Sequence, residues 1–373
     1  MTSDTLFRPI TIHGMSLRNR IVMAPMTRVF ASDDSVPTAA MAEYYRKRAA
    51  GEVGLIVSEG VTVDHPSASY DRNVPSLSTP AQIQGWRGVT AAVHGDGGKI
   101  AAQLWHVGRQ RTLKKAPFPD APTLSSGDLR SHAPSASGTP MAKPRAMTLD
   151  EIRETQQAFA RSAAMAREAG FDAVEIHGAH GYLVDQFLWA GSNNRTDEYG
   201  GSLNNRMRFA VELVAEVRKA VGPGYPVLFR FSQWKADDYN ARIADTPEEL
   251  GHILGGLKAA GVDAFHASQR DHEEESFPPS PLNLAGWAEK LAGLPAISVG
   301  KVALTGEFTS SFRGEEFDLR PLDGVIAQME RGDYSLIAIG RALIGDPELP
   351  RKIREGRYQE VIPFRREMLK TLE

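Results

Sequence analysis

The chain of 373 residues contains no cysteine. This absence excludes disulfides, thiolate metal sites, iron–sulfur clusters and a cysteine nucleophile. The N-terminus lacks the apolar segment of a signal peptide, and no apolar run reaches the roughly 20 residues of a membrane-spanning helix. Lys and Arg (43) nearly balance Asp and Glu (46), which leaves no broad basic field for nucleic acid. We therefore expect a cytoplasmic protein that binds neither membranes nor nucleic acids.

Short apolar strands recur along the chain, and several follow a helix that ends in glycine. This helix–glycine–strand pattern is clearest in residues 168–176, 259–266 and 331–340, where a glycine stands at the expected end of the helix. The strands are apolar on both faces, as in a parallel sheet that is covered by helices. Eight strands are predicted, at residues 21–25, 54–58, 100–104, 171–176, 226–231, 262–266, 295–299 and 334–340.

Helical patterns separate these strands. Thr148 and Glu151 form a capping box at the start of one helix, and Pro247 takes the first helical position of another. Eight strand–helix units predict an α/β fold, a (β/α)8 TIM barrel. A doubly wound sheet is the alternative, but it usually has a Gly-x-Gly-x-x-Gly turn after its first strand, and none is present. The clearest helices are residues 38–50, 80–94, 148–169, 203–221, 246–260 and 347–355.

Other segments interrupt or precede the repeating units. Residues 10–17 predict an N-terminal β-hairpin that plugs the bottom of the barrel. Residues 109–145 and 269–281 leave from the C-terminal ends of strands, so both are expected to form long loops over the barrel mouth. A solvated loop is the alternative for the acidic run in residues 271–275. We expect residues 1–373 to form a single domain.

Two histidines and a tyrosine follow the fourth predicted strand. His177, His180 and Tyr182 lie where parallel α/β proteins place their chemistry. Neutral imidazoles can hydrogen-bond a substrate oxygen, and a phenol can give up a proton, so a carbonyl-activating site is expected. A zinc site is a rival interpretation, but it would need a third ligand such as His106 or His266. A purely structural role for the histidine pair is a further alternative.

Glycines at the ends of the last two strands favour a phosphate site. Gly300 follows the seventh strand, and Gly340 with Arg341 follows the eighth. Barrels often bind phosphate on backbone N–H groups at this position, and glycine lets the backbone approach the anion closely. Arg341 can add charge-assisted hydrogen bonds.

Together these residues resemble the old yellow enzyme family of FMN-dependent ene-reductases. The resemblance covers nearly the whole chain and rests on the order of its motifs more than on any one of them. Two segments depart from the common pattern: residues 266–270 after the sixth strand, and the added polar excursion at residues 305–320 after the seventh. The matching segments are residues 19–28, 42–45, 58–60, 103–109, 177–182, 194–202 and 339–343.

The resemblance implies that FMN lies across the barrel mouth. Arg230 would sit beside the flavin N1 and C2 carbonyl, Gln103 would hydrogen-bond the pyrimidine edge, and Thr27 would donate to the C4 carbonyl. The remaining cofactor-binding residues would line the ring or hold the phosphate. They are Pro25, Met26, Gly60, Val299, Gly300, Gly340 and Arg341.

The resemblance also implies an NAD(P)H-dependent ene-reductase that acts on activated alkenes of α,β-unsaturated carbonyl compounds. His177 and His180 would bind the carbonyl oxygen, flavin N5 would deliver hydride, and Tyr182 would protonate the product. Trp105 would shape the substrate pocket, with core packing as the alternative, and Tyr70 would form a wall. Reduction of nitro esters or other xenobiotics is the nearest alternative, and a metal-dependent hydrolase is a more distant one. The protein is expected to be a monomer or a homo-oligomer.

Overall fold

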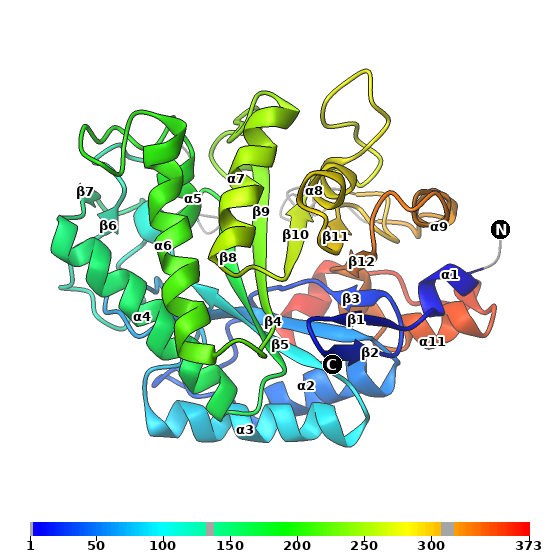
Figure 1. Ribbon diagram of the computed structural model, residues 1–373. Coiled ribbons are helices and arrows are strands. Elements are labelled where there is room, and N and C mark those ends of the chain that lie inside the picture. Colours follow the sequence, from blue (N-terminus) through cyan, green and yellow to red (C-terminus); the bar gives the residue numbers. More distant parts are fainter. Residues whose placement is uncertain (1–2, 132–137, 307–316) are drawn as a thin grey trace.

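The computed structural model describes residues 3–131, 138–306 and 317–373. The described residues form a closed barrel of parallel strands in the order β10-β11-β12-β3-β4-β5-β8-β9 (Figure 1). The barrel closes between its last and first strands, where Ile337 of β12 pairs with Ile21 of β3. The predicted (β/α)8 barrel is thereby confirmed, and the doubly wound sheet was wrong. The strands are β3 Ile21–Met23, β4 Leu55–Thr62, β5 Ile100–Trp105, β8 Ala173–His180, β9 Val227–Lys235, β10 Ala264–Ser268, β11 Ala296–Val299 and β12 Leu336–Ile339.

Helices surround the barrel, as Figure 1 shows. The Thr148 side chain accepts from the Glu151 N–H and Glu151 reaches back to Thr148, so the predicted capping box is present. Pro247 opens α7, as its sequence position indicated. The helices that follow the strands are α2 Ala39–Ala50, α3 Pro80–Gly95, α4 Leu149–Glu168, α5 Leu183–Leu188, α6 Leu203–Val221, α7 Pro247–Ala260, α8 Leu284–Ala292, α9 Asp323–Glu330, α10 Ala342–Gly345 and α11 Leu349–Arg354.

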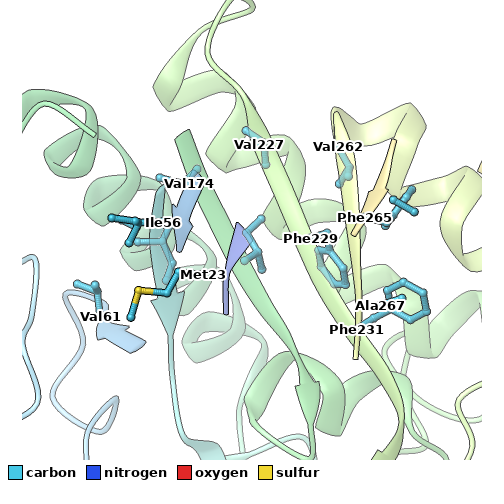
Figure 2. Packing of buried hydrophobic residues seen from close by; sticks show 14 of the residues in the cluster. Met23, Ile56, Val61, Val174, Val227, Phe229, Phe231, Val262, Phe265 and Ala267 are labelled. Atoms are coloured by element: carbon cyan, nitrogen blue, oxygen red, sulfur yellow. The ribbon is translucent and has the colours of Figure 1, made fainter. Parts of the chain in front are cut away.

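The hydrophobic core has two main parts, besides a small cluster of Val74, Trp105 and Val107. The larger part lies between the strands and the helices, and Figure 2 shows side chains from several neighbouring strands in it. The smaller part fills the bottom of the barrel, where the hairpin of β1 (Ile10–Ile12) and β2 (Met15–Leu17) packs against inward-facing strand residues. The predicted plug is therefore present, and it leaves the opposite, C-terminal end of the barrel for polar side chains.

Long segments cover that end. Residues 109–145, of which 132–137 lie outside the described residues, contain the short paired strands β6 (Leu124–Ser125) and β7 (Arg145–Ala146). This segment is tied to the loop after β9 by an ion pair between Arg109 and Asp237, whose side chains are each only 1% exposed, with an N–O distance of 2.7 Å. The segment that follows β5 is thus held by a buried ion pair to the loop that follows β9.

The second covering segment, residues 269–281, is only partly solvated. His272 is buried with its Nδ1 3.1 Å from Gln328 Oε1, and Asp271 accepts from Arg320 at 2.9 Å. The purely solvated loop considered from the sequence was therefore wrong for these two residues, because each has a partner in the segment that follows β11, the strand next to β10. Of the excursion at residues 305–320, residues 307–316 lie outside the described residues. The assignment of the whole chain to one domain stays a prediction.

Candidate active site

The predicted histidine pair and tyrosine lie together at the end of β8. The rings of His177 and His180 have centroids 5.2 Å apart and stand nearly perpendicular, at 87°. The Tyr182 ring lies 4.9 Å from His177 and 4.9 Å from Trp105. Tyr70 also contacts Trp105 edge-on, with the ring centroids 5.6 Å apart. The structure thus brings together five residues that the sequence assigned to substrate binding and catalysis.

Both histidines are neutral. Burial, followed by the positive charge of Arg230, holds the pKa of each ring well below its ordinary value. Nδ1 of His177 accepts the Ala179 N–H at 3.3 Å, so the proton of this ring is on Nε2. Burial raises the pKa of Tyr182 to about 12, which keeps its hydroxyl protonated. The cluster therefore offers N–H and O–H donors without a net charge.

The turn that carries Tyr182 is fixed from below by a buried ion pair. Asp185 accepts the Gly181 N–H at 2.7 Å and pairs with Lys235 at 2.8 Å, and both charged side chains are fully buried. Gln186 donates to the Gly181 carbonyl at 2.7 Å. Because Gly181 has φ +79°, this backbone conformation suits glycine. Asp185, Gln186 and Lys235 were not predicted from the sequence, and the ion pair that fixes the turn joins residues 50 positions apart.

A second buried group lies inside the barrel, one layer below the histidines. The Glu175 carboxylate accepts from Gln103 Nε2 at 2.8 Å and is 2.7 Å from His266 Nδ1. Burial opposes the charge of Glu175, but His266 and Arg230 lower its pKa below the usual value. His266 was weighed only as a metal ligand, and Glu175 was missed. A charged or imidazole side chain at an inward position of an apolar strand was the available signal.

Arg230 lies beside this pair with a free donor. It is buried on β9, in register with His266 of β10, and its Nε has no hydrogen-bond partner among the described residues. Burial lowers the pKa of its guanidinium below the usual value. A buried cationic donor without a partner is costly unless a ligand satisfies it. Arg230 therefore fits a position against an electron-rich or anionic ring.

Residues after β3 and on β4 are arranged around a buried carboxylate. The chain after β3 continues through the partly exposed Pro25, Met26 and Thr27. Glu59 accepts from the Arg28 N–H at 3.0 Å and thereby fixes the backbone directly after Thr27. Burial raises the pKa of Glu59 to about 7.

Gly60, the next residue of β4, permits a close contact with Trp105. A Cβ at Gly60 would lie 2.5 Å from the Trp105 ring. The small residue is therefore required for Trp105 to occupy its place in the aromatic cluster.

The predicted phosphate site lies across the barrel from β8. β12 is four strands away from β8 in the ring of eight, and β11 is its neighbour. Among the described residues, a Cβ at Gly340 would meet only one atom within 4 Å, Met26 Sδ at 3.7 Å. Val299 is partly exposed beside Gly300. Arg341 packs over Phe317 at 4.8 Å and donates to the Gly306 carbonyl at 2.8 Å.

These features fit a flavin nucleotide. Gly340 with Arg341 suits a phosphate on one side of the barrel mouth, and the buried Arg230 with its unsatisfied donor suits a ring system on the other. Gly300 is packed instead, because a Cβ there would lie 2.7 Å from the Gln269 carbonyl oxygen. Within the described ranges, no three His, Asp or Glu side chains are grouped as a metal site requires.

The sequence model of the NADH:flavin oxidoreductase / NADH oxidase family matches residues 5–310. The chain belongs to this family. It is 36% identical over 366 residues to the NADH oxidase of Thermoanaerobacter brockii, covering 95% of this chain and 52% of that protein, so it spans about half the length of this relative. It is also 36% identical over 343 residues to the NADPH dehydrogenase of Bacillus subtilis strain 168, covering 92% of each chain.

Among solved structures, the old yellow enzyme homologue from Zymomonas mobilis matches with a TM-score of 0.81 and 28% identity, over 99% of this chain and 96% of that chain. The family resemblance carried by the sequence motifs is confirmed. Membership of the family makes the protein an oxidoreductase with FMN as cofactor and NAD(P)H as reductant. In the described part of the chain, no helix has both the length and the apolar character of a membrane span.

Proposed function

We propose that the protein is an NAD(P)H-dependent ene-reductase that reduces the C=C bond of α,β-unsaturated carbonyl compounds. The observation that carries the proposal is the cluster of two neutral imidazoles and one protonated phenol at the end of β8. Donors of this kind can polarise a carbonyl group without forming an ion pair with the substrate. Among the described residues, neither imidazole has a carboxylate partner, which favours neutral donors over a general base.

In this proposal, FMN lies between the two sides of the barrel mouth. Bound FMN supplies a hydride that it has taken from NAD(P)H. Arg230, whose Nε has no partner among the described residues, would donate to the flavin pyrimidine, and Thr27 would donate near C4. Gln103, whose amide nitrogen donates to Glu175, would hydrogen-bond the pyrimidine edge. The other proposed contacts are made by Pro25, Met26, Gly60, Val299, Gly300, Gly340 and Arg341.

The substrate carbonyl oxygen is bound by His177 and His180. His177 donates through Nε2–H, because its Nδ1 already accepts a backbone N–H. This hydrogen bond withdraws electron density from the conjugated alkene, and the β-carbon becomes the better hydride acceptor. Tyr182 transfers its hydroxyl proton to the α-carbon and is reprotonated from solvent. Trp105 and Tyr70 form the wall of the pocket.

The proposal is tested by following the visible flavin absorbance without oxygen in two steps. NAD(P)H should bleach the FMN-loaded protein, and 2-cyclohexenone should then restore the oxidised spectrum with formation of cyclohexanone. His177→Ala should slow the second step, whereas His252→Ala, which alters an exposed helix residue, should not. Reoxidation by a nitrate ester but not by the enone would assign the protein to the alternative reaction.

A further inference from the structure

His180 is held by contacts on both its backbone and its ring. It has φ +64°, which is uncommon for a residue with a side chain. Its N–H donates to Ser232 Oγ at 3.0 Å, and its carbonyl accepts from Gln110 Nε2 at 2.9 Å. Its Nε2 is 2.8 Å from Ser268 Oγ. The Nε2 atom is thus occupied by the protein, which leaves Nδ1 as the ring nitrogen that can face a ligand.

The hydrogen bond to Ser268 determines where the His180 proton lies. Ser268 is 3% exposed, and the described residues provide no other partner for its hydroxyl. If His180 donated from Nε2, the Ser268 hydroxyl hydrogen would be buried without an acceptor. If Ser268 donates instead, its only donor is used, and an unfilled hydroxyl lone pair is less costly than an orphaned donor. The second arrangement places the His180 proton on Nδ1.

The indole of Trp234 holds the plane of the ring. It stacks on His180 with centroids 4.4 Å apart and an angle of 28°. The Trp234 Nε1–H donates to the Ser268 carbonyl at 3.2 Å, so the stacking residue and the hydrogen-bonding residue are themselves connected. Ser232, which binds the His180 N–H, also donates to the Trp234 carbonyl at 2.7 Å. The three residues form one support around His180.

We propose that Ser268 is a positioning residue that fixes His180 as the Nδ1–H tautomer, with Trp234 holding the ring plane. The inference deepens the proposed function, since the two histidines would then donate from different nitrogens: Nε2 of His177 and Nδ1 of His180. Because the two rings are nearly perpendicular and donate from different ring nitrogens, they can donate to one oxygen from two directions. Ser268 and Trp234 then act on the substrate only through His180.

The tautomer can be measured directly. In the FMN-loaded protein labelled with ¹⁵N-histidine, the ¹⁵N shifts of His180, assigned by their loss in His180→Gln, should show a protonated Nδ1 and an unprotonated Nε2. A protonated Nε2 in the unaltered protein would overturn the proposal, and this result requires no folded Ser268 variant. Ser268→Ala should convert His180 to a mixture of tautomers, and Ser268→Thr should preserve the Nδ1–H form. The control Ser162→Ala, which alters a buried serine of α4, should leave the His180 tautomer unchanged.

Phenol binding separates this inference from the proposed function. A phenol oxygen imitates the polarised carbonyl oxygen, and its binding can be followed by perturbation of the flavin spectrum. Ser268→Ala should weaken phenol binding about 3- to 10-fold, as expected for one lost hydrogen-bond alignment. If His180→Ala leaves phenol binding unchanged, the carbonyl-binding role is wrong even where the ¹⁵N shifts show the Nδ1–H form. If His180→Ala weakens binding while the shifts show Nε2–H, only the role of Ser268 is wrong.

Discussion

Replacing Tyr182 by Phe separates the proposed proton transfer from everything else that this residue does. The ring packs between His177 and Trp105 at 4.9 Å from each, and Phe retains both contacts. No hydrogen bond to the Tyr182 hydroxyl is present among the described residues, so its removal should change the free energy of unfolding by less than about 1 kcal/mol. The substitution therefore removes a proton and little else.

The expected kinetic effect follows from that loss. General-acid catalysis contributes roughly 100- to 10,000-fold, which corresponds to about 3–5 kcal/mol of barrier in the reaction of reduced enzyme with the enone. Because the pKa of Tyr182 is raised to about 12, the rate in the unaltered protein should be constant from about pH 6 to 9. Reduction of the enzyme by NAD(P)H needs no proton from Tyr182 and should keep its rate.

Anaerobic stopped-flow spectroscopy measures the two half-reactions separately. Tyr239→Phe is a suitable control because Tyr239 is half-exposed and contacts Trp234 rather than the proposed reacting groups. Equal rates of enone reduction in Tyr182→Phe and the unaltered protein would refute the assignment of the proton donor. A loss confined to the NAD(P)H half-reaction would refute it as well, and would place Tyr182 at the nicotinamide instead.

Three further predictions concern the cofactor site and the buried charges. Gly340→Ala should leave the thermal midpoint of the apoprotein unchanged, because its Cβ has space, but should weaken FMN binding more than about tenfold in a fluorescence titration. Glu59 has a folded pKa of about 7 against an ordinary 4.5, so the folded state binds its proton more tightly and stability should fall by up to about 3 kcal/mol as pH rises through this range. Urea unfolding of Glu59→Gln should lack this pH dependence. Lys235→Met leaves the buried Asp185 carboxylate without its partner and should cost about 3–5 kcal/mol, whereas Lys99→Met, which alters a side chain that is 39% exposed in an ion pair of equal length, should cost less than about 1 kcal/mol.

Each of these predictions has a contradicting outcome. A destabilised Gly340→Ala apoprotein would show that the glycine serves the fold rather than the cofactor. A Glu59→Gln variant whose stability keeps the pH dependence of the unaltered protein would assign that dependence to another group. Equal losses of stability in Lys235→Met and Lys99→Met would mean that burial does not distinguish the two ion pairs.

The barrel could be predicted because its strands are apolar on both faces and recur with helices between them. The residues at which those strands end could not be predicted from the same pattern, because the strand ends are polar. β8 was predicted to end at Ile176 but continues to His180, and β9 continues past Phe231 to Lys235. In both cases polar inward-facing side chains find partners on other strands or loops, and a single segment carries no information about such partners.

The same reason explains which parts of the site were missed. His177, His180 and Tyr182 are close in sequence, so their grouping followed from one strand end. The Glu175–His266 contact joins residues 91 positions apart. Ser268 reaches His180 across 88 positions, and nothing in the local sequence of either residue indicates the other. The donors could be predicted from the sequence, whereas the groups that orient them required the fold.

The origin of the two added hydrogens tests the proposed chemistry most directly. The FMN-loaded protein would reduce 2-cyclohexenone with unlabelled NAD(P)H in D₂O, and NMR would locate deuterium in the saturated ketone at once, before exchange with solvent. We expect hydrogen from NAD(P)H at the β-carbon and, at the α-carbon, one deuterium of defined stereochemistry that Tyr182 delivers. Deuterium at the β-carbon, or no saturated ketone at all, would contradict hydride transfer to an alkene polarised by His177 and His180.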